Sequence, residues 1–173
     1  MKVLAISGSL RANSTNTALV RAIATLAPAG MAFTIYDGLG DLPHFSPELD
    51  IDDAPAPVRK LRELLQAADV VLICTPEYAY GMPGSLKNAL DWTVSSGEFS
   101  RKPVAALSAS PSYLGGEKAH ASLLLVLTAL DAQVAEGATL IVPHVRTKLT
   151  ADGRISDPET AQALRAVLDA LAS

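Results

Sequence analysis

Short apolar runs alternate along this chain with longer segments in which apolar residues recur every three or four positions. Runs of three to five mainly apolar residues predict strands, and the longer periodic segments predict helices. The five predicted strands span residues 3–6, 33–36, 70–74, 104–107 and 140–142. Because the two kinds of segment alternate, we expect an α/β fold in which crossover helices join parallel strands.

Each predicted helix has an apolar stripe that would pack against the sheet. The stripes consist of Leu19, Ala22, Ile23 and Leu26; Val58, Leu61, Leu65 and Ala68; Leu123, Val126, Leu127 and Leu130; and Leu164, Val167, Leu168 and Leu171. Asp157 before Pro158 predicts a capped helix start, and Asp53 before Ala54-Pro55 is a weaker signal of the same kind. We also expect Ser85 to cap a fifth helix.

Four of the predicted strands are apolar on both faces, which is typical of a parallel sheet covered by helices on each side. Residues 31–36 differ, because Ala32 and Thr34 alternate with larger apolar residues. We therefore expect this strand at an edge of the sheet.

The segment 37–53 is a long irregular stretch with two glycines and two prolines. Loops of this length inside compact domains are more often functional than not. We expect it to contribute to a site or an interface.

Composition narrows the range of partners. The length of 173 residues suits a single domain over 1–173, and 49% hydrophobic residues exclude a disordered chain. Fourteen Lys and Arg against 18 Asp and Glu give a net charge of −4, and no basic run occurs. Neither nucleic acid nor an anionic membrane surface is expected as a partner.

The single cysteine and the short apolar stretches indicate in which cellular compartment the protein is expected. The single cysteine, Cys74, cannot form an intramolecular disulfide, and residues 3–6 are too short for the apolar core of a signal peptide. The longest other apolar stretch, 121–130, is half of what a membrane span needs. We expect a cytoplasmic protein.

The first predicted strand runs into a loop that is rich in hydrogen-bond donors. Residues 7–17 contain a glycine, Arg11 and several hydroxyl and amide side chains just before a helix. Such a loop suits a phosphate group at a helix N-terminus. The alternative is that Asn13 or Ser14 caps the helix and the rest is a turn.

Two common nucleotide signatures are missing. The sequence has no G-x-x-x-x-G-K-[ST] motif and no G-x-G-x-x-G motif after a strand. A P-loop nucleotidase and a Rossmann dinucleotide site are therefore disfavoured, and a phosphomonoester fits better than a pyrophosphate.

We expect the loop after the third predicted strand to be rigid, and the loop after the fourth consists mainly of small residues. Residues 75–85 contain two prolines and two glycines, and 108–116 are mostly small. Their exposed backbone groups suit the rim of a flat heterocycle, with Tyr78 or Tyr80 beside the ring. Packing at a subunit or loop contact is the alternative role for either tyrosine.

These residues together resemble the NAD(P)H-dependent FMN reductase family. The resemblance rests on Gly8-Ser9-Leu10-Arg11 with Ser14 and Asn16, on Thr75-Pro76-Glu77-Tyr78, and on the Pro83-Gly84-x-Leu86-Lys87-Asn88-Ala89-x-Asp91-Trp92 run. It extends over essentially the whole chain. It implies a flavodoxin-like three-layer sandwich with a five-stranded parallel sheet of order 2-1-3-4-5, and flavin, quinone, azo-dye or chromate reduction.

The resemblance also implies site residues. FMN phosphate contacts would come from Ser9, Arg11, Ser14 and Asn16, with Thr17 as an addition. Ring contacts would come from Pro76, Glu77, Tyr78 and Ala79, with Ser110 and Gly115 near the ring. Family members commonly have Asn where Ala79 stands, so only the backbone of Ala79 is carried over.

Other chemistry is weakly indicated. We interpret Cys74 as a small buried residue, because the Cys-x5-Arg loop of a phosphatase is absent: Tyr80 stands six residues later. The three histidines, His44, His120 and His144, lack the spacing of a zinc site, and no G-x-S-x-G elbow occurs. We expect no metal and name no catalytic side chain.

The sequence thus predicts an NAD(P)H-dependent FMN reductase that passes a hydride from NADH or NADPH through FMN to free flavin, quinone or another small acceptor. A ping-pong mechanism is expected. A one-electron flavodoxin-type carrier and a non-catalytic flavin-binding module are the alternatives. The resemblance implies a homodimer or homotetramer, and apolar surface on Leu86, Leu90, Trp92 and residues 43–47 is the expected interface.

Overall fold

The computed structural model describes residues 1–172, and its centre is a five-stranded parallel sheet. The strands are β1 (Lys2–Ser7), β2 (Ala32–Tyr36), β3 (Val70–Thr75), β4 (Pro103–Ala109) and β5 (Gln133–Val142). Their order is β2-β1-β3-β4-β5, and Val3 of β1 pairs with Phe33 on one side and Val70 on the other. The predicted order is confirmed.

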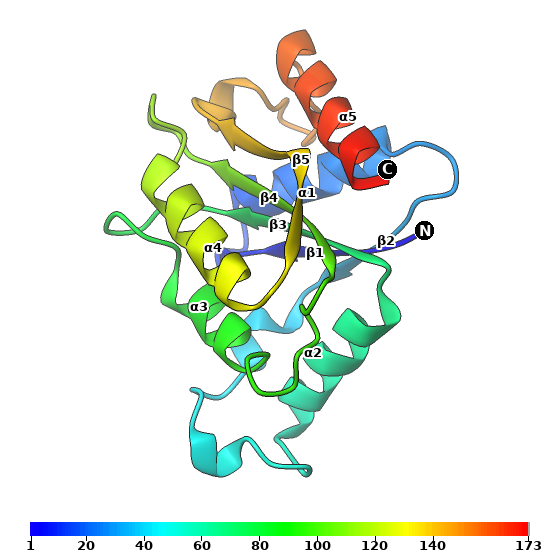
Figure 1. The fold of residues 1–173 in the computed structure, drawn as a ribbon. Coiled ribbons are helices and arrows are strands. Elements are labelled where there is room, and N and C mark those ends of the chain that lie inside the picture. The colour runs from blue at the N-terminus through cyan, green and yellow to red at the C-terminus, as the bar shows by residue number, and fades with distance from the viewer. Residues whose placement is uncertain (173) are drawn as a thin grey trace.

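Helices cover both faces of the sheet (Figure 1). On one face lie α1 (Thr15–Leu26) and α5 (Pro158–Ala172); on the other lie α2 (Ala56–Ala67), α3 (Gly84–Asp91) and α4 (Glu117–Ala129). Two apolar clusters form the core, one between each helix layer and the sheet. The fold is therefore the predicted flavodoxin-like three-layer sandwich. Within residues 1–172, no helix combines the length and hydropathy needed to cross a membrane.

The two edge strands compare differently with the sequence-based prediction. β2 lies at an edge, as predicted. β5 is the other edge, so the expectation that its apolar residues 140–142 are covered on both faces is wrong: Ile141 is exposed, and β5 is half exposed and starts at Gln133. Glu136-Gly137 interrupts its apolar pattern, and a register shift against β4 between Val104 and Ala106 lets the strand continue past this bulge.

The predicted helix starts are correct at one position and wrong at two. Asp157 caps α5, because its Oδ2 accepts a hydrogen bond of 3.0 Å from the Thr160 backbone N–H. Asp53 does not cap α2, which begins later at Ala56 with a proline in its first turn; Asp53 is instead exposed. Ser85 does not cap α3 either, since that helix already begins at Gly84. In α2 the proline of the first turn has no N–H group to satisfy, and in α3 the residue at the N-cap position is Pro83, which has no side chain that could cap the helix.

The long segment 37–53 is fastened to α3. The Asn88 side chain donates to the Pro43 carbonyl oxygen (2.9 Å) and accepts from the Phe45 N–H (2.8 Å), and Trp92 Nε1 donates to the same carbonyl (2.9 Å). The Phe45 and Trp92 rings meet edge to face at 5.1 Å. The motif around Asn88 and Trp92 therefore holds this segment in place.

Burial contradicts the apolar surface that was expected to form an interface. Leu86, Leu90 and Trp92 are each at most 2% exposed and belong to the core. Their side chains face the sheet and the 37–53 segment because the α3 stripe is needed to close this layer. The part of the interface prediction that rests on these three residues is wrong, whereas residues 43–47 are half-buried or exposed, and the homodimer or homotetramer stays a prediction.

Candidate functional site

The predicted site residues lie on three loops at the carboxyl edge of the sheet. These loops follow β1, β3 and β4, and the Gly8 N–H donates to the Cys74 carbonyl (2.9 Å), which ties the first loop to the end of β3. The Ser110 N–H donates to the Val142 carbonyl (3.2 Å), which ties the loop after β4 to the end of β5. Open α/β sheets bind ligands at this edge, where the strand order reverses.

Part of the predicted phosphate loop lines one cavity of about 350 Å³. Ser9, Arg11 and Thr17 lie in its wall together with Ser7, and the opposite wall includes Asp37 and Asp41 from the segment after β2. Thr17 Oγ1 donates to Ser7 Oγ (2.9 Å), and the Arg11 N–H donates to Ser9 Oγ (3.3 Å). Hydroxyl donors and a guanidinium therefore gather at one place.

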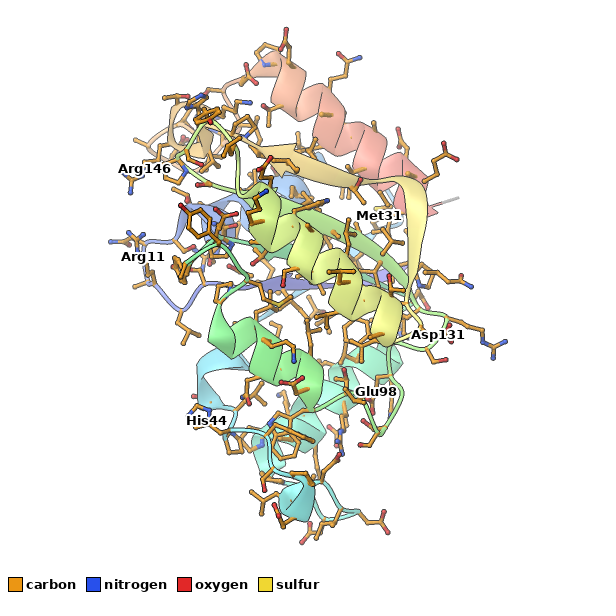
Figure 2. All side chains as sticks on the ribbon, turned by 60° about the vertical axis from the view of Figure 1, so that its left-hand side comes forward. Arg11, Met31, His44, Glu98, Asp131 and Arg146 are labelled. Atoms are coloured by element: carbon orange, nitrogen blue, oxygen red, sulfur yellow. The ribbon has the colours of Figure 1, made fainter. Side chains whose placement is uncertain are left out.

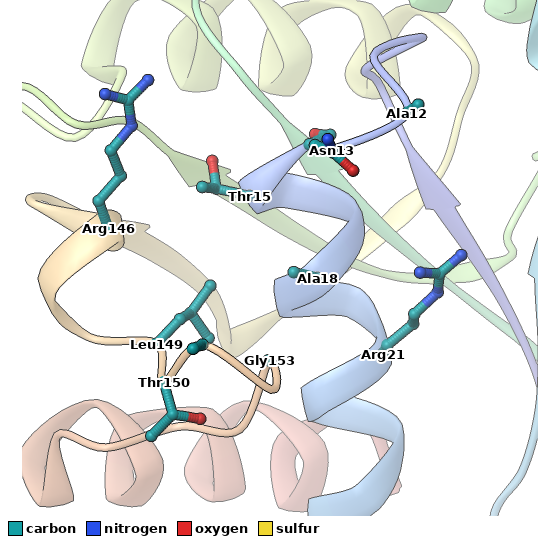
Figure 3. A pocket seen from close by; sticks show the side chains of 11 residues that line it. Ala12, Asn13, Thr15, Ala18, Arg21, Arg146, Leu149, Thr150 and Gly153 are labelled. Carbon is teal, nitrogen blue, oxygen red and sulfur yellow. The ribbon is translucent and has the colours of Figure 1, made fainter.

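Sequence reasoning missed Arg21, which lines the same cavity. It lies on α1 four residues after Thr17, so the i, i+4 spacing was the available signal. In Figure 3 its guanidinium lies on the opposite side of α1 from that of Arg146. No ion pair within residues 1–172 includes Arg11 or Arg21, so both charges are available to an anion.

Ser14 and Asn16 have structural contacts instead of lining that cavity. Ser14 caps α1, because its Oγ accepts from the N–H groups of Asn16 (3.2 Å) and Thr17 (3.4 Å). The buried Asn16 side chain donates to the Ala109 carbonyl (3.1 Å) and accepts from Cys74 Sγ (3.1 Å). Asn16 thus joins the start of α1 to the ends of β3 and β4; its phosphate contact stays a prediction.

A second cavity, of about 470 Å³, lies beside residues 12–15, at the end of the predicted phosphate loop (Figure 3). It is enclosed by the start of α1 and by the segment between β5 and α5, including Arg146, Leu149 and Thr150. Sequence reasoning did not indicate it. Figure 3 shows the two arginines that border it on opposite sides of α1, so their charges do not converge.

The loop after β3 contains a tight, strained turn. Tyr78 and Gly81 exchange two backbone hydrogen bonds of 3.0 and 3.1 Å, and the residues between them, Ala79 and Tyr80, have φ values of 50° and 61°. Left-handed backbone costs a non-glycine residue about 1–2 kcal/mol. Pro76 is buried, whereas Tyr78 is 47% exposed and Tyr80 is 83% exposed, so neither tyrosine is buried in the core.

Glu77 connects this loop to α4. Its Oε2 accepts hydrogen bonds from the N–H groups of Lys118 (2.9 Å) and Ala119 (3.1 Å) in the first turn of that helix. The predicted site residue therefore lies at the carboxyl edge with one carboxylate oxygen already engaged.

Gly115 lies where three chain segments meet. Its φ is +64°, and a Cβ there would approach Ile141 Cγ2 to 2.5 Å and the Pro143 nitrogen to 2.9 Å. Ser108 Oγ donates to its carbonyl oxygen (3.0 Å). Ser110, half-buried nearby in sequence, contacts Ser112 Oγ (3.1 Å). Glycine at 115 allows this close backbone approach.

Cys74 is fully buried, and desolvation raises the pKa of its thiol to about 12. The interpretation of Cys74 as a small buried residue is confirmed, because a thiol with this pKa stays protonated at neutral pH. His44 and His144 are exposed. No group of three metal-ligating side chains occurs in the part of the chain that the structure describes.

His120 is buried and its Nδ1 has no hydrogen-bond partner within residues 1–172. Burial lowers its pKa, because the charged imidazolium is desolvated. The unfolded chain therefore binds more protons than the folded chain once the pH falls below about 6.5. We expect the free energy of unfolding to decrease as the pH is lowered from 7 to 5.

Urea unfolding at several pH values checks this expectation. The variant His120→Gln should flatten the dependence, and His144→Gln, at an exposed position, should leave it unchanged. Asp50 and Asp157 have lowered pKa values, from hydrogen bonds to Ser95 and Thr160, and so titrate below this pH window. If the free energy of unfolding changed with pH equally in the native chain and in His120→Gln, the pH dependence would not come from His120.

Comparisons with known proteins agree with this geometry. Residues 1–147 match the model of the family described as NADPH-dependent FMN reductase. An NAD(P)H-dependent FMN reductase of Pseudomonas aeruginosa is 35% identical over 99% of this chain and 93% of its own length. A 2-hydroxy-1,4-benzoquinone reductase of Burkholderia sp is 34% identical over 100% and 95%.

A solved structure is also similar. FerB of Paracoccus denitrificans, a flavoenzyme NAD(P)H:(acceptor) oxidoreductase, superposes with a TM-score of 0.82 at 30% identity, covering 98% of this chain and 94% of that one. The sheet order and the sequence matches thus agree, and the chain is an oxidoreductase that belongs to the NADPH-dependent FMN reductase family.

Proposed function

We propose that the chain binds FMN at the carboxyl edge and uses it to pass a hydride from NADH or NADPH to free flavin, a quinone or another small acceptor. The observation that supports this most is the cavity in which Ser9, Arg11, Thr17 and Arg21 gather, between the loop after β1, helix α1 and the segment after β2. Family membership and relatives named as FMN and quinone reductases support the same activity.

The donor set fits a phosphate monoester. A phosphate monoester carries a charge of about −1.5 to −2, which the guanidinium groups of Arg11 and Arg21 would balance. The hydroxyl groups of Ser9 and Thr17 would donate further hydrogen bonds to it. Asp37 and Asp41 in the opposite wall disfavour a more highly charged ligand such as a pyrophosphate. Ser14 and Asn16 would then hold the loop in shape around the phosphate.

The loops after β3 and β4 would hold the isoalloxazine ring. Backbone groups of Pro76, Glu77, Tyr78 and Ala79 would line one side, and Ser110 and Gly115 would lie at the other. FMN supplies the hydride chemistry when bound, so the protein's task is to bind and orient it with one face open. No side chain is required as an acid or base in this proposal.

Two alternatives share the same fold. A flavodoxin-type carrier would exchange single electrons with a protein partner, and a flavin-binding module would not turn over. The named activities of the relatives favour an enzyme. The mild net charge of −4 also differs from the acidic docking face that a carrier uses.

Steady-state kinetics with NADH or NADPH and a benzoquinone test the proposal. Both substrates must reach the same open face of the flavin, so they are expected to alternate and to give parallel lines in double-reciprocal plots at several quinone concentrations. Intersecting lines would contradict the ping-pong mechanism. No oxidation of either nicotinamide by the FMN-loaded protein would contradict the reductase and favour a carrier or binding module.

A further inference from the structure

The start of α4 takes its cap from a distant loop. Its N-cap residue, Gly116, has no side chain and a left-handed φ of 88°. The free N–H groups of Lys118 and Ala119 instead meet Glu77 Oε2, which comes from 41 and 42 residues earlier in the chain. A carboxylate at a helix N-terminus is favoured both by these hydrogen bonds and by the helix dipole.

These two hydrogen bonds fasten the loop after β3 to another element. Within residues 1–172, no other hydrogen bond links residues 76–81 to a segment outside their own strand and turn. The strained pair Ala79 and Tyr80 follows Glu77 by two and three residues. Strained backbone persists only where its surroundings hold it: the Tyr78–Gly81 hydrogen bonds close this turn, and the Glu77 side chain joins the loop that contains it to α4.

The contact between Glu77 and the start of α4 lies beside Gly115. The Cβ position of Gly116 is 3.5 Å from Glu77 Cβ and 3.5 Å from Ser108 Cβ, and Ser108 Oγ holds the Gly115 carbonyl. The carboxylate therefore fixes the spacing between the two loops that would flank the ring.

We propose that Glu77 is a positioning residue that sets the distance between residues 76–81 and the start of α4, so that backbone groups of both reach one flavin ring. This inference rests on the proposed function. This role differs from direct contact between the Glu77 side chain and the ring, because Glu77 Oε2 already accepts the two hydrogen bonds from α4.

The experiment compares Glu77→Ala and Glu77→Gln with the control Glu117→Gln. Glu117 lies in the same helix turn and its ion pair to Lys118 (3.1 Å) is within that turn, so Glu117→Gln changes the charge at the helix start and breaks this exposed pair without removing a hydrogen bond to the loop after β3. Dissociation constants for FMN and for riboflavin are measured by fluorescence quenching. Riboflavin has the ring without the phosphate, so it reports on ring positioning alone.

Glu77→Ala is expected to weaken FMN and riboflavin alike, by roughly tenfold to a hundredfold, since two charge-assisted hydrogen bonds are lost. The ratio of the two constants should stay that of the native chain. Glu77→Gln, which keeps an acceptor oxygen, should restore most of the affinity, and Glu117→Gln should match the native chain. A lower melting temperature for Glu77→Ala with unchanged constants would show a structural role only and overturn the inference.

Hydrogen exchange without ligand makes the test independent of flavin binding. The backbone amides of residues 77–81, Lys118 and Ala119 should exchange faster in Glu77→Ala than in the native chain, and at the native rate in Glu117→Gln. Unchanged exchange in Glu77→Ala would overturn the inference whatever the chain binds. If exchange is faster in Glu77→Ala but the native chain binds neither FMN nor riboflavin, the proposed function is contradicted, while Glu77 is still the residue that holds the loop against α4.

Discussion

Replacing Arg11 with alanine is expected to weaken FMN binding by roughly tenfold to a hundredfold while leaving riboflavin binding unchanged. Arg11 lines the 350 Å³ cavity with Ser9 and Thr17 and has no ion pair within residues 1–172, so its guanidinium is free to bind a phosphate. A charge-assisted hydrogen bond of this kind contributes about 1.5–3 kcal/mol. Fluorescence quenching with both flavins measures the effect.

Arg146→Ala is the matched control for Arg11→Ala. Both arginines lie at the carboxyl edge (Figure 2), but Arg146 borders the second cavity and not the one that Arg11 lines. Its removal should change neither affinity. Equal dissociation constants for FMN and riboflavin in the native chain would contradict the phosphate assignment. Equal losses for both flavins in Arg11→Ala would place Arg11 at the ring instead.

Replacing Gly115 with alanine is expected to lower the free energy of unfolding by about 2–5 kcal/mol. Alanine at this position would have to adopt a φ of +64°, which costs about 1–2 kcal/mol. Its Cβ would also overlap Ile141 Cγ2 at 2.5 Å and the Pro143 backbone nitrogen at 2.9 Å. The side chain of Ile141 has room to turn, but the backbone at 143 does not move without shifting the end of β5. Urea unfolding measures the loss.

Gly153→Ala separates the two causes. Gly153 also has a positive φ, +80°, but nothing lies within 4 Å of its Cβ position. This variant should lose only about 1–2 kcal/mol, from the backbone conformation alone. If both variants lost the same amount, the close approach at Gly115 would have no energetic weight and its place in the site would rest on position only.

The periodicity of the chain predicts most of the fold because burial on both faces leaves a strong signal. The strands β1, β3 and β4 are covered by helices on each side, so their sequences are continuous apolar runs. β5 lies at an edge and contains a bulge near Gly137, so half of its residues are polar or exposed and only its last part reads as a strand. Edge strands lose the pattern because one of their sides meets solvent.

Motifs identify site residues but not the direction of their side chains. Asn16 and Glu77 belong to the motifs that suggest flavin contacts, yet Asn16 joins α1 to the sheet and Glu77 caps α4. Asn88 and Trp92 belong to the third motif of the resemblance, at 83–92, and hold the 37–53 segment. A motif records that a residue type is needed, and a supporting hydrogen bond needs it as much as a ligand contact does.

Local sequence thus decides where strands and helices form, that the sheet is parallel and helix-covered, and which loops are rich in donors, because these properties depend on neighbours within a few residues. Only the tertiary structure brings Arg21 into the cavity of Arg11, places Glu77 against Lys118 and Ala119, and buries Leu86, Leu90 and Trp92 instead of exposing them. The hydrogen bonds of Glu77 to α4 and of Trp92 to Pro43 join residues 41 to 49 positions apart, and the order of strands in the sheet determines that these segments meet.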